Sequence, residues 1–238
     1  MRLLELFAGT HSIGRAFSNL GWDVISLDIA PKSQATITAD LLQWDYTVFP
    51  KDHFDFIWGS PPCTMYSVAR TTAKTPRDFV LADALVAKVQ EIVLYFQPKF
   101  GFTFENPQTG LLKDRAVVAG IPWIDTTYCV WSSPLHQYKK KTRLWVGGCM
   151  ESWRSRTMCC KAFPCQYMLG GRHLVSAQRL TSQGHTAHSV NQLYSIPPEL
   201  CNSIARHVTV YSLNSAASAR AFARWSLTAL KDLSHVLG

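Results

Sequence analysis

The chain has 238 residues, of which 47% are hydrophobic and 17% are charged, so its composition excludes a disordered polypeptide and suits one α/β domain with a small insertion. No apolar run reaches the roughly 18 residues that span a bilayer, and Glu5 interrupts the short apolar run at the N-terminus, so we expect no membrane span and no signal peptide. The seven cysteines are odd in number and gather late in the chain, which argues against a disulfide scaffold and predicts a reduced, intracellular protein.

The net charge of +8 is concentrated in one short segment. Residues 1–135 carry 11 basic and 13 acidic side chains, residues 136–173 carry 8 and 1, and residues 174–238 carry 5 and 2. Such a segment is typical of a surface that binds a polyanion, plausibly nucleic acid, but a solvated basic face would have the same composition. Charge alone does not separate these two interpretations.

Strand and helix patterns alternate through the first two-thirds of the chain. Apolar runs predict strands at residues 3–9, 23–29, 35–40, 54–60, 100–107, 126–132 and 142–148. Helical spacing predicts helices at residues 12–21 and 78–96. Strands separated by helices indicate an α/β fold with a mostly parallel sheet and helices on both faces.

The composition changes after residue 148. Residues 149–190 are rich in Cys, Arg, Gly and Ser and are expected to form a small inserted lobe, after a core made by residues 1–148. Residues 191–238 are expected to return to the core, with a helix at residues 196–211 that has proline at its start. An amphipathic stretch in the tail 212–238 suggests a terminal docking helix.

Reactive or polar residues stand at the carboxyl ends of five predicted strands. They are Gly9, Asp28, Asp40, Cys63 and Glu105. Because ligands of parallel α/β sheets bind at this edge, we expect these residues to meet in one site.

The first three strand ends are consistent with an adenosine-containing cofactor. The glycine-bearing turn FAGTHSIG, residues 7–14, would bring backbone and a helix N-terminus close to a ligand. Asp28 stands where an acidic residue commonly binds ribose hydroxyls, and Asp40 is a candidate for an adenine amine. Glycines end many strands, however, and either aspartate could simply cap a helix.

The other two strand ends suggest nucleophilic chemistry. Cys63 follows Pro61 and Pro62, so its direction is fixed, and a low pKa together with exposure would make it a nucleophile. Glu105 ends the adjacent strand, and in its protonated form it could donate to a ring nitrogen. Addition of a thiolate to an electron-poor pyrimidine, helped by an acid, fits this pair better than a buried structural thiol does.

These residues carry a family resemblance. The chain resembles the S-adenosylmethionine-dependent DNA cytosine-5 methyltransferases, and in particular their compact phage- or virus-like members. ELFAG, SLDI and TAD are similar to the cofactor motifs, GSPPCTMYS to the Pro-Cys nucleophile loop and FENP to the Glu-Asn motif. KTRLWVGG and YSIPP are similar to the Arg-x-Arg strand and the final motif. The likeness runs in family order from residue 3 to about residue 210.

The resemblance implies a Rossmann-like class I methyltransferase sheet with a small recognition lobe. It implies methyl transfer from S-adenosylmethionine to carbon 5 of cytosine in double-stranded DNA, after base flipping and through a covalent Cys63 adduct. Glu105, Arg143 and Lys141 would be catalytic with Cys63. The cofactor would contact Phe7, Ala8, Gly9, Thr10, His11, Asp28, Ile29, Asp40, Pro61 and Ser195. The protein would work in the nucleus, cytoplasm or nucleoid, according to its host.

Three departures from the family pattern stand at site positions. His11 follows Gly9 where the family turn has its second glycine, and its ring would crowd the methionine end of the cofactor. Lys141 stands in the place of the first arginine of the Arg-x-Arg pair and loses its bidentate geometry. Tyr194 replaces the asparagine of the final motif.

The lobe is too small to bury much hydrophobic core, so we expect that a structural zinc ion could stabilise it. Its expected ligands are Cys160, Cys165, His173 and either Cys149 or Cys159, with free thiols as the alternative. Contacts to nucleic acid are expected from Ser67, Arg70, Lys139, Lys140, Arg154, Arg156, Lys161 and Arg172.

Two other functions remain open at this point. A tRNA cytosine-5 methyltransferase would use the same catalytic residues. A catalytically inactive homologue that binds nucleic acid or a partner is the second, although retention of both Cys63 and Glu105 argues against it.

Overall fold

A computed structural model describes residues 1–68, 70, 73–131, 133, 136–173, 175 and 190–214. Most of the tail, with the amphipathic stretch expected to form a docking helix, lies outside the described residues. Within the described ranges, no helix combines the length and the apolar character needed to cross a membrane.

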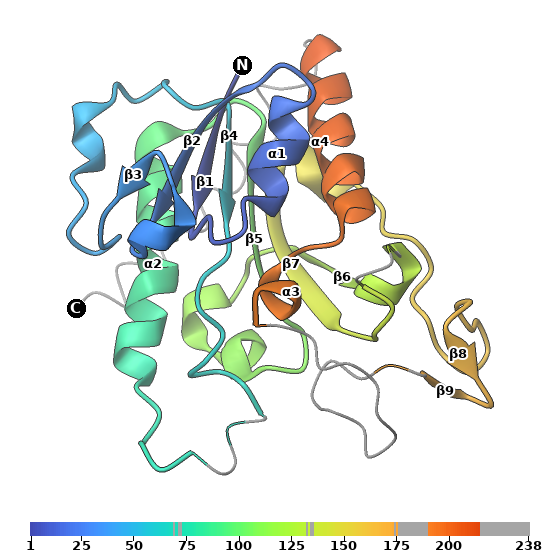
Figure 1. The fold of residues 1–238 in the computed structure, drawn as a ribbon. Helices are drawn as coiled ribbons and strands as arrows, with labels where there is room; N and C mark the ends of the chain where they lie inside the picture. The colour runs from blue at the N-terminus through green and yellow to red at the C-terminus, as the bar shows by residue number, and fades with distance from the viewer. Residues whose placement is uncertain are drawn as a thin grey trace.

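Seven strands form one sheet in the order β3-β2-β1-β4-β5-β7-β6 (Figure 1). The strands are β1 (Arg2–Leu6), β2 (Asp23–Asp28), β3 (Ile37–Thr38), β4 (Phe56–Gly59), β5 (Gly101–Pro107), β6 (Trp123–Thr127) and β7 (Lys141–Gly148). The first five strands in this order run parallel, and β7 is antiparallel to both of its neighbours. Together with the helices described next, this is the expected α/β fold with a mostly parallel sheet.

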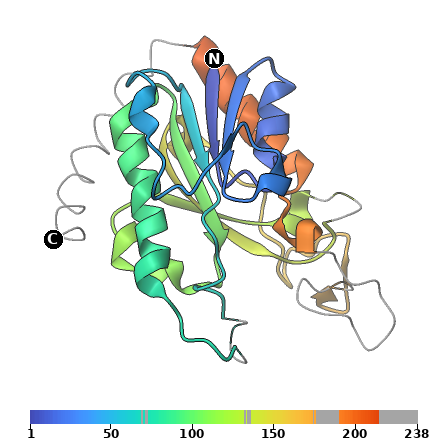
Figure 2. The same cartoon turned by 60° about the vertical axis from the view of Figure 1, so that its left-hand side comes forward.

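Helices cover both faces of the sheet. Helix α2 (Phe79–Phe96) lies on one face, and α1 (Ser12–Ser18) and α4 (Pro198–Leu213) lie on the other (Figure 2). The short α3 (Val190–Tyr194) precedes α4, and 3-10 turns lie at Pro31–Ser33, Tyr46–Val48, Leu111–Asp114, Ala116–Val118, Tyr128–Trp131 and Cys149–Ser152.

Strand β4 shows how the sequence builds the two apolar cores. Ile57 is buried in the cluster that includes the apolar face of α2, whereas Phe56 and Trp58 are buried in the cluster that includes α1 and α4. Alternate side chains of a strand point to opposite faces, so a continuous apolar run marks a strand that is covered on both sides.

The strand expected at residues 126–132 lies earlier in the chain, at Trp123–Thr127. The chain then forms a 3-10 turn at Tyr128–Trp131. Tyr128 and Trp131 are three residues apart and are both buried in the same cluster, which a helical turn allows and a strand does not. The apolar and aromatic residues of this run therefore misplaced the strand.

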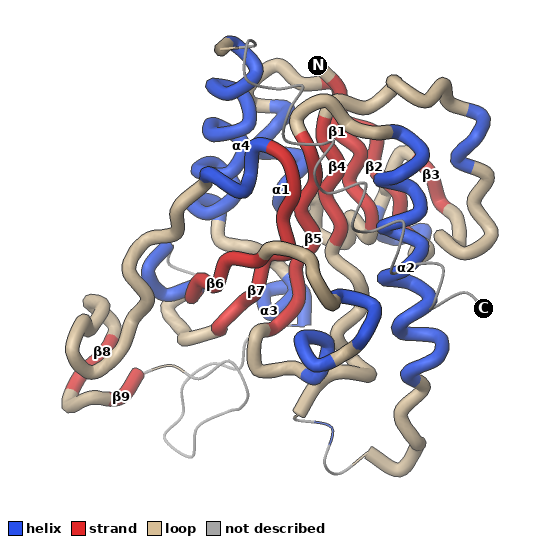
Figure 3. The backbone as a smooth tube through the Cα atoms, turned by 180° about the vertical axis from the view of Figure 1, so that it is seen from behind, coloured by secondary structure: helices blue, strands red, loops and turns tan. Residues whose placement is uncertain are grey.

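The described part of the lobe stands beside the β6–β7 end of the sheet (Figure 3). Met150 and Trp153 still pack in the core, so the chain leaves the core only after Trp153. A short hairpin, β8 (Met168–Leu169) and β9 (Arg172–His173), turns at Gly170 and Gly171. Both glycines have positive φ, as a two-residue hairpin turn of this kind requires.

Candidate active site

The turn between β1 and α1 is held against the end of β2. The backbone N–H of Gly9 donates to Asp28 Oδ2 over 2.8 Å, and the N–H of Ala30 donates to Asp28 Oδ1 over 2.8 Å. Phe7, Gly9 and His11 all adopt positive φ, between 46° and 57°. The predicted glycine turn is therefore a tight loop, and Asp28 organises its backbone.

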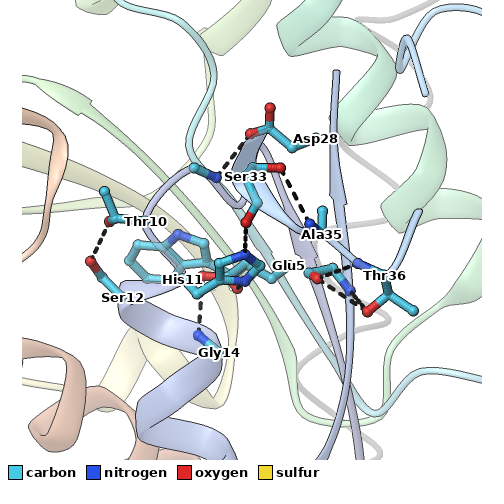
Figure 4. Close-up of polar contacts among 12 residues, drawn as sticks. Glu5, Thr10, His11, Ser12, Gly14, Asp28, Ser33, Ala35 and Thr36 are labelled. Carbon is cyan, nitrogen blue, oxygen red and sulfur yellow. Dashed lines mark hydrogen bonds and ion pairs between the residues drawn. The ribbon is translucent and has the colours of Figure 1, made fainter. Parts of the chain in front are cut away.

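A buried carboxylate supports the start of α1 (Figure 4). Glu5 is 3% exposed, and its Oε1 accepts the backbone N–H of Gly14 over 3.0 Å. A Cβ atom at residue 14 would lie only 2.5 Å from Glu5 Oε2, so a side chain there would have to displace this carboxylate. Glu5 thus satisfies one of the free N–H groups of the helix start from within the sheet.

The ring of His11 contacts Ser33 and Glu5. Its Nε2–H donates to the carbonyl of Ser33 over 2.7 Å, and its Nδ1 lies 3.7 Å from Glu5 Oε2. The Glu5 carboxylate raises the pKa of His11. Ser33 and Glu5 therefore hold the imidazole (Figure 4), and His11 is not part of the cavity lining. The expected crowding of the cofactor by this ring stays a prediction.

A cavity of about 270 Å³ lies at the carboxyl ends of β1, β2, β4 and β5. Its lining includes seven of the residues that were expected to bind the cofactor: Phe7, Ala8, Gly9, Thr10, Asp28, Ile29 and Pro61. The catalytic candidates Cys63 and Glu105 line the same cavity. Four of the five predicted strand ends therefore meet here.

Three expected cofactor residues lie outside this lining: His11, Asp40 and Ser195. Asp40 is exposed, and its Oδ1 accepts the N–H of Leu42 in a local turn, where no helix begins. Ser195 Oγ lies 2.9 Å from His136 Nε2 and donates to the carbonyl of Gln192. Its neighbour Ile196 lines the cavity instead.

The loop that carries Cys63 is fastened by residues that the sequence interpretation did not assign to the site. The Nδ2 of Asn106 donates to the carbonyl of Pro61 over 2.9 Å, so β5 holds the Pro-Pro turn. The N–H of Tyr66 donates to the carbonyl of Cys63 over 3.1 Å, and Arg77 Nη2 donates to the carbonyl of Ser67 over 2.9 Å. The FENP motif offered a signal for Asn106, but no local pattern marks Arg77.

The electrostatics of Cys63 differ from the expectation. Burial, and then the negative charge of Glu105, raises the pKa of the Cys63 thiol, while the nearby Lys140 ammonium lowers it. The expected low pKa is therefore wrong for the protein without ligands, because desolvation of the half-buried thiolate outweighs the lysine. Glu105 is 8% exposed, and its Oε2 accepts the hydroxyl of Thr142 over 3.0 Å.

Strand β7 and the residue that precedes it place different side chains at the cavity from those expected. Arg143 forms a two-point ion pair with Asp125 at 2.7 and 2.9 Å and lies 3.6 Å over the ring centroid of Trp123. Both partners belong to β6, and Arg143 does not line this cavity, so its expected role at the base stays a prediction. Lys140 instead lines the cavity, and its Nζ donates to the carbonyl of Leu193 over 3.0 Å.

A second, larger cavity of about 610 Å³ adjoins the first, and we call it the outer groove. The two cavities share Cys63, Asn106, Pro107, Lys140 and Tyr194. The lining of the outer groove includes four residues that were expected to contact the nucleic acid or the base, namely Ser67, Lys139, Lys140 and Lys141. It also includes two residues of the lobe, His173 and Val175.

The other basic residues expected at nucleic acid do not line the outer groove. Arg156 lies 4.4 Å over the ring of Trp131 and 3.8 Å from the carboxylate of Glu199. Arg154 donates to backbone carbonyls of its own turn, and Arg70 to those of its own loop. Lys161 and Arg172 are exposed on the lobe.

The structure changes the expected zinc ligand set. Cys165 and His173 do lie together, but their partners are Cys159 and Cys129. Cys149 is 2% exposed within the hydrophobic core, and Cys160 is exposed next to the group rather than in it. Cys129 was missed because it precedes Cys159 by 30 residues, lies outside the lobe and carries no spacing signal.

Comparison with known proteins agrees with this geometry. The sequence model of the C-5 cytosine-specific DNA methylases matches residues 1–117. A probable DNA (cytosine-5)-methyltransferase of Frog virus 3 (isolate Goorha) is 35% identical over 159 residues, which are 61% of this chain and 70% of the viral protein. The chain belongs to the C-5 cytosine-specific DNA methylase family. This family carries out S-adenosylmethionine-dependent methylation of cytosine at carbon 5 in DNA, which confirms the resemblance.

Two solved structures are also similar to the chain. A putative DNA modification methyltransferase encoded within an E. coli prophage has a TM-score of 0.47 at 16% identity, over 66% of this chain and 51% of that one. The S. pombe Dnmt2 methyltransferase has a TM-score of 0.40 at 16% identity, over 65% and 53%. The chain therefore spans about half the length of these two proteins.

The residues that line the smaller cavity, of about 270 Å³, fit the cofactor of the family, S-adenosylmethionine. The turn at Gly9 brings backbone to the cavity edge, and Asp28 and Ile29 line it at the end of β2. Glu5 also lines the cavity, and its buried Oε2 has no hydrogen-bond partner among the described residues. That oxygen can accept a hydrogen bond from a bound cation such as an amino group.

Proposed function

We propose that this chain methylates carbon 5 of cytosine in double-stranded DNA through a covalent bond between Cys63 Sγ and carbon 6 of the base. The observation that carries the proposal is that Cys63 and Glu105 line the same cavity as Gly9 and Asp28, at adjacent strand ends. When bound, S-adenosylmethionine supplies the methyl group. Gly9 and the lining residues Phe7 and Ile29 would hold it.

The target cytosine would leave the duplex and enter through the outer groove. Glu105 would hold ring nitrogen 3 and the exocyclic amine, and Thr142 would keep the carboxyl group oriented. The Cys63 thiolate would bond to carbon 6, and the electrons of the carbon 5–carbon 6 double bond would move towards carbon 5 and the ring. After carbon 5 has been methylated, loss of its proton would restore the double bond and release Cys63.

Lys140 takes the place that the sequence interpretation gave to Arg143. It lines both cavities, and its positive charge favours the Cys63 thiolate. Lys139 and Lys141, which line only the outer groove, are in position to contact phosphates of the flanking strand. These lysines belong to residues 136–173, which carry a net charge of +7.

The test is transfer of tritium from labelled S-adenosylmethionine to mixed-sequence duplex DNA, the same DNA as single strands, and bulk tRNA. Cys63→Ala is the catalytic control. Label in duplex DNA that disappears in Cys63→Ala supports the proposal. Label only in tRNA or only in single strands would overturn the substrate. If no label appears while the cofactor still binds, the chain is an inactive binding homologue.

A further inference from the structure

Three thiols and one imidazole converge where the lobe meets the core. The ligand atoms of Cys129, Cys159, Cys165 and His173 all lie within 4.8 Å of one another. His173 Nε2 lies 3.2 Å from Cys165 Sγ and 3.6 Å from Cys159 Sγ. Four ligands around one zinc ion, with Zn–S bonds of about 2.3 Å, would have their donor atoms roughly 3.5 to 4 Å apart. Only a small contraction of this group is needed.

We propose that Cys129, Cys159, Cys165 and His173 bind one Zn²⁺ ion that fastens the lobe to the core. Three thiolates and one imidazole nitrogen form a closed tetrahedral set, which is typical of structural zinc. The backbone supports this role, because the N–H of Cys165 donates to Cys159 Sγ over 3.3 Å. A hydrogen bond of this kind stabilises a coordinated thiolate.

The lobe needs such a link because it has almost no core of its own. Its two strands have two residues each, and the side chains of Phe163 and Leu169 are 65% and 72% exposed. Cys159 is the exception, with 2% exposure. Cys129 comes from the 3-10 turn after β6 and is buried, so the metal would join this lobe directly to the sheet.

The position of His173 gives the site a consequence for the rest of the molecule. His173 lines the outer groove as well as the ligand group. A zinc ion would therefore fix one wall of the groove in place, while remaining separate from Cys63 and Glu105, which are not in the ligand group.

A disulfide is the main alternative for these cysteines. It would join two of the three thiols and leave the third thiol and the imidazole without a role. Zinc uses all four residues, and it requires the thiols to be reduced. The two chemistries give opposite results when the free thiols of the unreduced protein are counted.

The experiment measures metal content in the full-length chain purified with zinc supplied. We expect about one zinc per chain in the unaltered protein and less than about a tenth of that in Cys159→Ser and Cys129→Ser. The matched control is Cys160→Ser, which changes the adjacent exposed thiol and should retain zinc. Zinc retained in Cys159→Ser, or lost equally in Cys160→Ser, would overturn the proposal.

Two measurements on the unaltered protein keep the test independent of variant folding. X-ray absorption at the zinc edge should show three sulfur ligands at about 2.3 Å and one nitrogen at about 2.0 Å. Oxygen ligands alone, or a thiol count that reveals a disulfide among these cysteines, would contradict the site. Because zinc is counted directly, Cys63→Ala should keep it, so failure of the proposed methyl transfer and failure of this site are distinguishable.

Discussion

Cys63 lies between two opposite charges, and this determines how it should react. Burial and then Glu105 raise its pKa, while Lys140 lowers it. The thiol should therefore be mostly protonated near neutral pH in the free protein. Substrate binding would have to lower the pKa of this thiol, for example if Glu105 lost its negative charge on contact with the cytosine base.

The balance predicts how alkylation of Cys63 depends on pH. Only the thiolate reacts with iodoacetamide, so the rate of alkylation should rise with pH. The pH at which the rate is half its maximum should lie above the ordinary pKa of a free thiol. Lys140→Gln removes the stabilising positive charge and should move the midpoint to higher pH. Glu105→Gln removes the opposing negative charge and should move it to lower pH. Mass spectrometry of the Cys63 peptide gives the rates.

Lys141→Gln is the matched control, because Lys141 lines the outer groove but is not among the charges that shift Cys63. Its midpoint should be that of the unaltered chain. Equal shifts in Lys140→Gln and Lys141→Gln would show that the field of the whole basic segment, rather than one lysine, controls the thiol.

Individual site residues were predictable where the signal is local in sequence. Cys63 follows two prolines and Glu105 precedes Asn106, and both positions are defined by the end of their own strand. Lys140 and Thr142 could not be assigned in this way. Their place beside Glu105 depends on the register between β5 and β7, which pairs Glu105 with Leu144 across a gap of 39 residues.

At the scale of elements, β7 divides its side chains between two functions. Thr142 faces the Glu105 carboxyl group, and Arg143 pairs with Asp125 on β6. Adjacent residues of a strand point to opposite faces, so these two roles cannot be exchanged. The same alternation explains why Arg143, which the Arg-x-Arg motif indicated, does not line the cavity that contains Glu105.

Two substitutions should separate these functions. Thr142→Val removes the hydroxyl that orients Glu105 and should lower kcat/KM for methyl transfer about tenfold, or about 1.4 kcal/mol, with little loss of stability. Arg143→Met leaves Asp125 unpaired at a mostly buried position, where the two side chains are 11% and 13% exposed. It should lower the free energy of unfolding by about 3 kcal/mol.

Urea unfolding and methyl transfer at low temperature provide the two measurements for this pair. The activity of folded Arg143→Met should stay within about threefold of the unaltered protein, as expected for a group whose loss affects stability rather than the transition state. A fully stable Arg143→Met protein that has lost its activity would show that the arginine reaches the substrate after all.

The expected elements were mostly confirmed where apolar runs are long and end at glycine or proline. The helix expected at residues 78–96 is α2 at Phe79–Phe96, and its N-terminus is capped by Asp78. The strand at residues 126–132 was misplaced because aromatic residues suit both strands and buried turns. Only contact with the core distinguishes the two at Tyr128 and Trp131.

At the scale of the whole molecule, the basic segment divides into a groove wall and a structural part. Lys139 lines the outer groove, whereas Arg156 stacks on Trp131 and pairs with Glu199 of α4. The net charge identified this basic segment. It could not tell which basic residues line the outer groove and which pack within the protein, because lysine and arginine fill both roles.

This division predicts different salt dependence for two variants. Lys139→Gln should weaken binding to duplex DNA and reduce the slope of log K against log salt by about 1, as expected for the loss of one phosphate contact. Arg156→Gln should leave the slope unchanged. Fluorescence anisotropy across a salt series measures both, and an equal loss of slope in Arg156→Gln would place that arginine at the DNA.

The central claim is that Cys63 itself bonds to the cytosine. Duplex DNA that carries 5-fluorocytosine tests it most directly, because fluorine on carbon 5 cannot leave as a proton, so Cys63 cannot be released. With S-adenosylmethionine present, mass spectrometry of the digested complex should find the methylated base attached to the peptide that contains Cys63. An adduct on another cysteine, or methyl transfer that persists in Cys63→Ala, would contradict the account.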